Sequence, residues 1–101
     1  MLPVRVSLLA ELDLDAIWSH VAERSGSLKI AGDLVDSITR VFTLLATNPQ
    51  SGRLRNDIDP DVRSFPIGNY LVYYRLLPNS IVVSRVLHAK RDQTSAFTSE
   101  S

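Results

Sequence analysis

Apolar and polar residues follow two different periods along this chain, and the change of period divides it into a helical part and a stranded part. Residues 3–7 are rich in valine and begin with proline, which predicts a short first strand. Apolar residues then recur at helical spacing, and after residue 61 they form short runs typical of strands. The pattern therefore predicts the element order β-α-α-β-β-β.

Two helices are predicted between residues 8 and 47. Ser7 can cap the first helix and Gly26 can end it, while Ser27 can cap the second, which the Pro49-containing turn stops. Because the connection is short, the helices should form an antiparallel hairpin. The first apolar stripe also contains Trp18, which we expect to pack in the core. The stripes are Leu14, Ile17, Trp18 and Val21, then Leu34, Ile38, Val41, Phe42 and Leu45.

Three further strands are predicted at residues 62–65, 69–76 and 80–87, after an irregular polar stretch. A tight turn around Pro78 joins the last two strands as a hairpin. The expected fold class is α+β, with a two-helix hairpin packed on a small antiparallel sheet. Residues 1–92 form the single predicted domain, and residues 93–101 read as a flexible tail.

The predicted strands place apolar side chains on both faces of the sheet, although one helical hairpin can cover only one of these faces. Leu71 and Tyr73 alternate with Tyr70, Val72 and Tyr74 along the middle strand. An antiparallel sheet covered on one side should alternate apolar and polar residues. Either a partner protein covers the second face, or a curled sheet encloses a second core of its own.

Composition narrows the function classes. The 101 residues suit one domain, and no apolar run is long enough to span a bilayer. The first residues lack the features of a signal peptide, so a cytoplasmic protein without membrane contact is expected. Without cysteine, disulfides and thiolate chemistry are excluded, and two histidines do not suggest a structural zinc site. No metal or other cofactor is therefore predicted.

Charge is balanced overall but unevenly distributed. The formal net charge of zero gives no global signal for binding nucleic acid. Residues 62–91 nevertheless contain five cationic side chains and no acid. These cations are Arg63, Arg75, Arg85, Lys90 and Arg91. The stranded half should therefore carry a basic surface that the helical half lacks.

Four segments together resemble a known family. Residues 62–75 (VRSFPIGNYLVYYR) and 85–92 (RVLHAKRD) are similar to the paired-strand and closing motifs of ParE toxins. Residues 15–22 (DAIWSHVA) and 48–53 (NPQSGR) are similar to the first helix and a turn of the same family. Each segment alone is a weak signal, but all four occur in order at matching spacing. The resemblance is to the ParE branch of the RelE/ParE superfamily and covers residues 1–92.

The resemblance implies a type II toxin that stabilises plasmids and is neutralised in a hetero-oligomer. The antitoxin would be a ParD-like ribbon-helix-helix protein, which alone contacts DNA. ParE toxins inhibit DNA gyrase by protein binding, whereas the RelE branch cuts mRNA on the ribosome. A ParE-like chain is thus expected to inhibit gyrase, with ribosome-dependent mRNA cleavage as the alternative. A third possibility is an antitoxin-binding protein whose toxicity has been lost.

A metal-free ribonuclease needs an acid, a base and several cations close together. His88 is the candidate acid or base, with Arg63, Arg75, Arg85 and Arg91 as the cations. Ala89 stands where one RelE-like subgroup has tyrosine, and the chain has only two lysines. Catalytic residues are therefore not expected, and His88 can instead close its strand by bonding a carboxylate such as Asp92.

The remaining candidates are contact residues for the target or the antitoxin. The strand arginines could form a contact patch, or they could pair with Asp57, Asp59 or Asp61. Tyrosines are enriched at protein interfaces because an apolar ring carries a polar tip. His20, next to the helical stripe, is expected at the rim. The predicted contact set is Arg63, Tyr70, Tyr73, Tyr74, Arg75, Arg85, His88 and Arg91.

Overall fold

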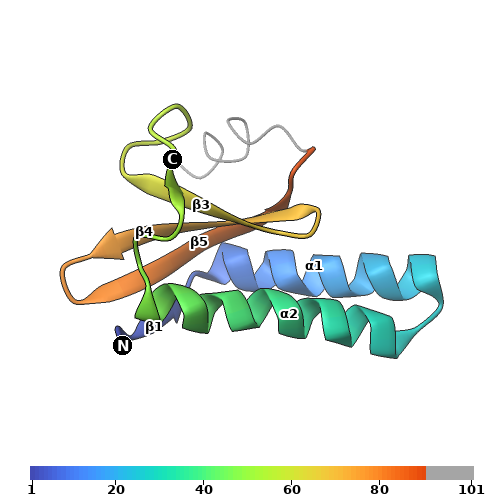
Figure 1. Cartoon of the computed structure of the whole chain (residues 1–101). Helices are drawn as coiled ribbons and strands as arrows, with labels where there is room; N and C mark the ends of the chain where they lie inside the picture. The colour runs from blue at the N-terminus through green and yellow to red at the C-terminus, as the bar shows by residue number, and fades with distance from the viewer. Residues whose placement is uncertain (91–101) are drawn as a thin grey trace.

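A computed structural model describes residues 1–90 and confirms the predicted α+β fold. Two helices, α1 (Leu8–Ser25) and α2 (Leu28–Thr47), form a hairpin that covers one face of the sheet (Figure 1). The strands are β1 (Val4–Val6), β2 (Arg53–Leu54), β3 (Val62–Ile67), β4 (Tyr70–Leu77) and β5 (Ser80–His88). Within these residues, neither helix has the length and apolarity needed to cross a membrane.

The predicted helix ends are confirmed by their capping bonds. The Ser7 hydroxyl accepts a hydrogen bond from the Ala10 amide at 3.0 Å. The Ser27 hydroxyl accepts one from the Ile30 amide at 3.1 Å. Gly26 ends α1 in the left-handed conformation, with φ of 68°. These local signals fix where the chain reverses, so the hairpin geometry follows from a few polar residues and one glycine.

The sheet is mixed, not purely antiparallel as predicted. Its strand order is β1-β5-β4-β3-β2, and β3, β4 and β5 are antiparallel neighbours. β1, however, runs parallel to β5, with Val4 opposite Ile81 and Val6 opposite Val83. After the two helices, β3, β4 and β5 form an antiparallel meander. Its last strand, β5, lies beside β1 and runs in the same direction as β1. β2 lies in the stretch predicted as irregular, because a strand of two residues has no period to detect.

The main core lies between the helical hairpin and the sheet. Ile17 is 8 % exposed, but its neighbour Trp18 is 39 % exposed, so the prediction that Trp18 packs in the core is wrong. Because a helix turns 100° per residue, only a narrow face of α1 can point at the sheet. The fully or nearly buried core side chains are Ala10, Ile17, Ile38, Val41, Phe42, Leu45, Val72, Tyr74, Ile81, Val83 and Val86.

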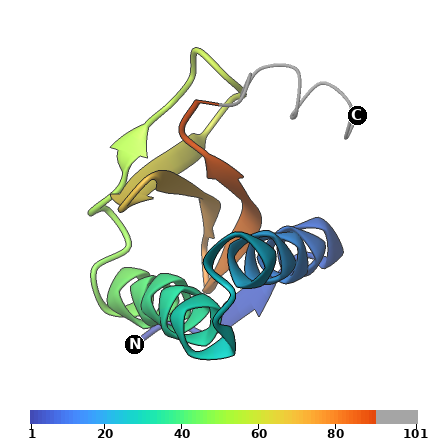
Figure 2. The same cartoon turned by 90° about the vertical axis from the view of Figure 1, so that its right-hand side faces the viewer.

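A second, smaller core explains why the strands are apolar on both faces. Val62, Tyr73 and Leu87 are buried on the face away from the helices, with Ile58 and Leu71 packed beside them. The segment between β2 and β3 covers part of that face, as the end-on view shows (Figure 2). Of the two explanations given above, the curled sheet with its own second core is the one observed.

Candidate functional site

The three strand arginines predicted to form one patch are divided between two places. Arg63 and Arg75 line a groove beside β3 and β4, whose volume is about 390 Å³. Arg85, on β5, instead pairs with Asp13 of α1. The side chains that line the groove are Leu54, Asp61, Arg63, Arg75, Leu76 and Leu77.

Arg63 and Arg75 are held by the loops next to their strands. Arg63 Nη1 donates to the Gly52 carbonyl at 2.9 Å. Arg75 donates to the Asp59 carboxylate and to the Pro60 carbonyl. The predicted pairing with Asp59 is therefore confirmed. Both arginines remain half-buried, so the groove presents fixed cations rather than mobile ones.

Arg85 forms a nearly buried ion pair that the sequence analysis missed. Its Nε and Nη2 atoms donate to the two Asp13 carboxylate oxygens at 2.8 and 2.9 Å. The side chains are 8 % and 12 % exposed. The same carboxylate accepts the Val86 amide at 3.0 Å. Arg85 is thus committed to linking α1 with β5, and it does not belong to a basic surface patch.

Asp13 also protects the edge of β5 where β1 no longer covers it. β1 pairs with β5 only as far as Val83, so the backbone beyond lies at an open edge. Just there, the Ser7 hydroxyl donates to the Ser84 carbonyl at 2.8 Å, and Asp13 accepts from Val86. Side chains of α1 therefore replace the missing strand at this edge.

The prediction that Tyr73 and Tyr74 form a contact face is contradicted, because both are completely buried. Successive residues of a strand point to opposite faces, and each face of this sheet has a core. Burial raises the pKa of both phenols. The Tyr74 hydroxyl accepts from the Gly52 amide at 2.8 Å and donates to the Pro49 carbonyl at 2.7 Å. Tyr74 therefore fastens β4 to the turn after α2.

Tyr70, in contrast, is half-exposed and packs against His88. The two rings meet edge to face, with centroids 5.2 Å apart. The Lys90 amide donates to His88 Nδ1 at 3.1 Å, so the neutral imidazole carries its proton on Nε2. Arg91 and the predicted partner Asp92 lie outside the described residues.

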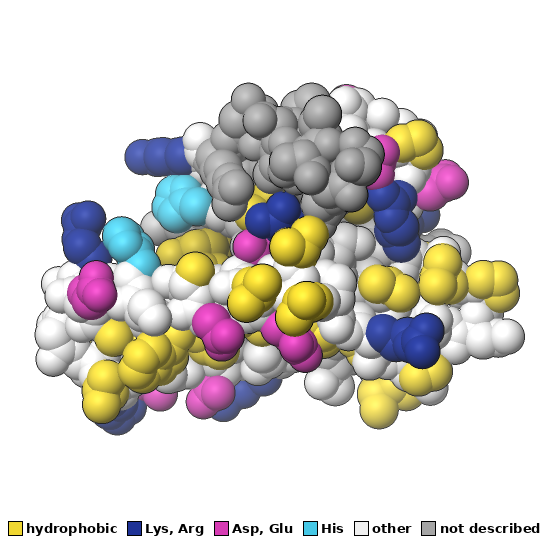
Figure 3. Space-filling model, turned by 180° about the vertical axis from the view of Figure 1, so that it is seen from behind, with side chains coloured by type: hydrophobic (Ala, Val, Ile, Leu, Met, Phe, Trp, Pro, Cys, Tyr) yellow, Lys and Arg dark blue, Asp and Glu magenta, His cyan; other side chains and the backbone are white. Residues whose placement is uncertain are grey.

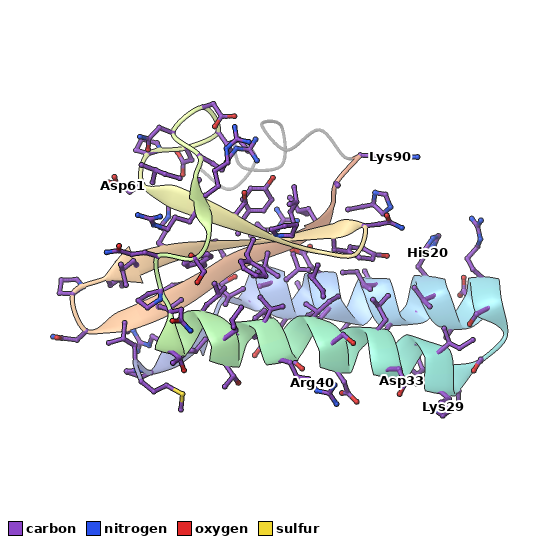
Figure 4. All side chains as sticks on the ribbon, viewed as in Figure 1. His20, Lys29, Asp33, Arg40, Asp61 and Lys90 are labelled. Carbon is purple, nitrogen blue, oxygen red and sulfur yellow. The ribbon has the colours of Figure 1, made fainter. Side chains whose placement is uncertain are left out.

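A second groove lies between α1 and the end of the β4–β5 hairpin, with a volume of about 310 Å³. The two histidines lie on its rim, close together on the face shown in Figure 3. His20 projects from α1 toward the end of the sheet (Figure 4), in agreement with its predicted rim position. The sequence did not reveal that His20 and His88 share one groove. The lining residues are Asp13, Ala16, Ile17, His20, Tyr70, Val86, Leu87 and His88.

The candidate nuclease residues that the structure describes are therefore not gathered around one point. His88 lines the α1 groove, whereas Arg63 and Arg75 line the β3–β4 groove. Arg85 is occupied by Asp13. Among residues 1–90, no group of three or more histidine or acidic side chains is arranged to hold a metal ion.

Known proteins of one family are similar to this chain. Residues 4–93 match the family model described as ParE toxin of type II toxin-antitoxin system, parDE. Toxin ParE3 of Caulobacter vibrioides is 35 % identical over 78 residues, which cover 77 % of each chain. Toxin ParE1 of Mycobacterium tuberculosis is 30 % identical over 86 % of this chain and 89 % of its own.

A solved structure shares the fold. It is titled chromosomal ParDE TA system from P. aeruginosa, and it superposes with a TM-score of 0.77 at 24 % identity. The superposition covers 87 % of this chain and 96 % of the other.

Proposed function

Because this chain belongs to the ParE toxin family of type II toxin–antitoxin systems, we propose that it inhibits DNA gyrase by protein binding and is neutralised by a ParD-like antitoxin. The family match covers nearly the whole domain and includes both strand motifs that carry the resemblance. A fold by itself does not select a target, since function resides in the site. The choice between gyrase binding and RNA cleavage therefore rests on the arrangement of the cations.

The separation of His88 from the strand arginines Arg63, Arg75 and Arg85 is the observation that favours binding over cleavage. Cleavage of RNA without a metal requires cations around the reacting phosphate and an acid or base within hydrogen-bond reach. Here His88 lies on one groove and Arg63 and Arg75 lie on another, while Arg85 is held by Asp13. A protein contact does not need such convergence, because it can use separate surface residues.

We assign the gyrase contact to the groove that contains Arg63 and Arg75. Its flanks carry the exposed apolar side chains Leu54 and Leu77, which are 45 % and 41 % exposed. Arginine is enriched at protein interfaces, and the buried centre of an interface is more apolar than the rest of the protein surface, so fixed arginines beside exposed leucines fit a protein contact.

The test is plasmid supercoiling by purified gyrase, titrated with this protein alone and then with its antitoxin. We expect inhibition or trapped cleaved DNA, reversed by the antitoxin. Leu77→Glu should weaken the inhibition at least about tenfold, as loss of an interface anchor does. Leu44→Glu is the matched control, because Leu44 on α2 is equally exposed at 41 % and lies outside both grooves.

Two results would contradict the proposal. One is the absence of any effect on gyrase from folded protein in large excess. The other is ribosome-dependent mRNA cleavage that His88→Ala abolishes while antitoxin binding is retained. The second result would support the RelE-like alternative.

A further inference from the structure

The loop that joins β2 to β3 brings acidic side chains to the groove beside β3 and β4. This acidic loop, residues 55–61, contains three aspartates. The carboxylate of Asp59 pairs with Arg75, which lines the groove, and Asp61 lines the groove itself. One of the two groove arginines is therefore already paired with an acid of the same chain.

The acidic loop is held in place by its backbone and by an apolar anchor. The Arg55 amide donates to the Val62 carbonyl at 2.7 Å and closes the loop, and Ile58 packs against the second core. Asp61, where β3 begins (Figure 4), has a φ of 62°, a left-handed conformation that aspartate adopts more readily than most residues. Its amide donates to Asn56 Oδ1 at 2.9 Å. These contacts shape the loop without using the carboxylate of residue 59.

The contact between Asp59 and Arg75 can be exchanged for another one. Arg75 donates to the Asp59 carboxylate and to the Pro60 carbonyl. The side chains of Arg75 and Asp59 are 32 % and 39 % exposed, so water reaches both, and such pairs contribute little to stability. The Arg85–Asp13 pair is only 8 % and 12 % exposed, and opening it would leave a charge buried. A carboxylate from another molecule can therefore replace Asp59 without disturbing either core.

The groove also suits an acidic peptide in its remaining features. Its lining contains two arginines and one acid. Arg63 donates to the Gly52 carbonyl, which is neutral, so this bond does not cancel the charge of the guanidinium. Leu54 and Leu77 add exposed apolar surface at the flanks. Apolar flanks favour a peptide over nucleic acid, whose affinity comes largely from contacts to its phosphates.

From these observations we infer that the groove takes an acidic segment of the target protein, and that a carboxylate of this segment replaces Asp59 on Arg75. Apolar side chains of the segment contact Leu54 and Leu77, and a further acid faces Arg63. In the free protein Asp59 occupies the binding position on Arg75, so it competes with the target and lowers its affinity. The inference rests on the proposed function, because it concerns the groove assigned to the gyrase contact.

The first test removes the internal competitor. Asp59→Asn keeps the shape of the side chain but not its charge, so gyrase inhibition should become about fivefold more potent, as expected when an exposed ion pair no longer has to be broken. Asp57→Asn is the matched control. Asp57 lies in the same loop and also pairs with an arginine, but that partner, Arg55, does not line the groove. This control should inhibit gyrase like wild type, and circular dichroism checks that both variants are folded.

The second test asks whether the gain acts through Arg75. Arg75→Gln alone should weaken gyrase inhibition about tenfold, because it removes the cation that the target carboxylate binds. In the Arg75→Gln background, adding Asp59→Asn should change the potency by less than about twofold, since the two residues act as one coupled pair.

The third test needs no gyrase. Phenylglyoxal modifies accessible arginines, and peptide mass spectrometry follows Arg75 separately from the others. Poly-L-glutamate is the probe for an acidic segment, and a DNA duplex at the same concentration of charge is the probe for phosphate. In Asp59→Asn, poly-L-glutamate should slow the modification of Arg75 at least about threefold, and more than the duplex does.

The outcomes separate this inference from the proposed function. If wild type inhibits gyrase and folded Asp59→Asn inhibits it no better, the inference is wrong. An equal gain in Asp59→Asn and Asp57→Asn also overturns it, because net charge alone would then set the potency. Protection of Arg75 by the duplex and not by poly-L-glutamate rejects it in favour of a phosphate ligand. If wild type does not inhibit gyrase, the proposed function fails; protection of Arg75 by poly-L-glutamate would then still support an acidic partner, and its absence would reject the inference as well.

Discussion

Tyr74→Phe removes one hydroxyl that joins β4 to the turn after α2. That hydroxyl makes two hydrogen bonds, to the Gly52 amide at 2.8 Å and the Pro49 carbonyl at 2.7 Å. Tyr74 is fully buried, and each lost bond costs about 1 kcal/mol net, so the free energy of unfolding should fall by about 2 kcal/mol. In a domain of this size, such a loss lowers the melting temperature by about 10 °C. Calorimetry or urea unfolding followed by circular dichroism measures both quantities.

Tyr70→Phe is the control, because Tyr70 is half-exposed and its ring would keep its contact with His88. It should change the free energy of unfolding by less than about 0.5 kcal/mol. The reasoning is refuted if Tyr74→Phe is as stable as wild type, since the buried Gly52 amide would then have no need of this acceptor.

Three other perturbations follow from the same packing. Asp13→Asn leaves the guanidinium of Arg85 nearly buried without its counter-charge, so it should cost about 3 kcal/mol in urea unfolding, whereas exposed Asp15→Asn should cost almost nothing. Gly52→Ala would place a Cβ 2.5 Å from the Tyr74 hydroxyl oxygen, and overpacking of this kind should cost about 2 kcal/mol by thermal unfolding. Burial raises the pKa of both buried tyrosines of β4 above the ordinary 10.0, so folding favours the protonated phenols. The stability that they contribute is therefore complete below pH 10 and is lost as pH rises through the folded pKa, which urea unfolding between pH 9 and 11 would show as a steep decline.

Local chemistry made the helices predictable. Ser7, Gly26 and Ser27 carry their own signals, because caps and left-handed turns depend on residues close in sequence. β4 and β5 also begin and end within one residue of the prediction, since a clear turn separates two apolar runs. By contrast, the parallel pairing of β1 with β5 joins residues 77 apart, such as Val4 and Ile81, and no local pattern encodes it.

The candidate site was less predictable, because side chains acquire their roles from distant neighbours. Arg85 looks like a surface cation in the sequence, and only the approach of α1 brings Asp13 to it. Tyr73 and Tyr74 look like interface residues until both faces of the sheet are seen to be covered. His20 and His88 each appear as isolated residues, and their shared groove exists only once helix and sheet have packed.

The position of β5 in the sheet affects how the protein can be synthesised. Among the strands of residues 1–90, β5 is the last to leave the ribosome, yet it lies between β1 and β4 and packs against both helices. β1 therefore has no strand to pair with, and the core under the helices lacks Val83 and Val86, until β5 has been synthesised. At bacterial rates, translation of the chain takes about 5–20 s, and native contacts of this separation form late. The core between the helices and the sheet is therefore completed only after β5 has been synthesised.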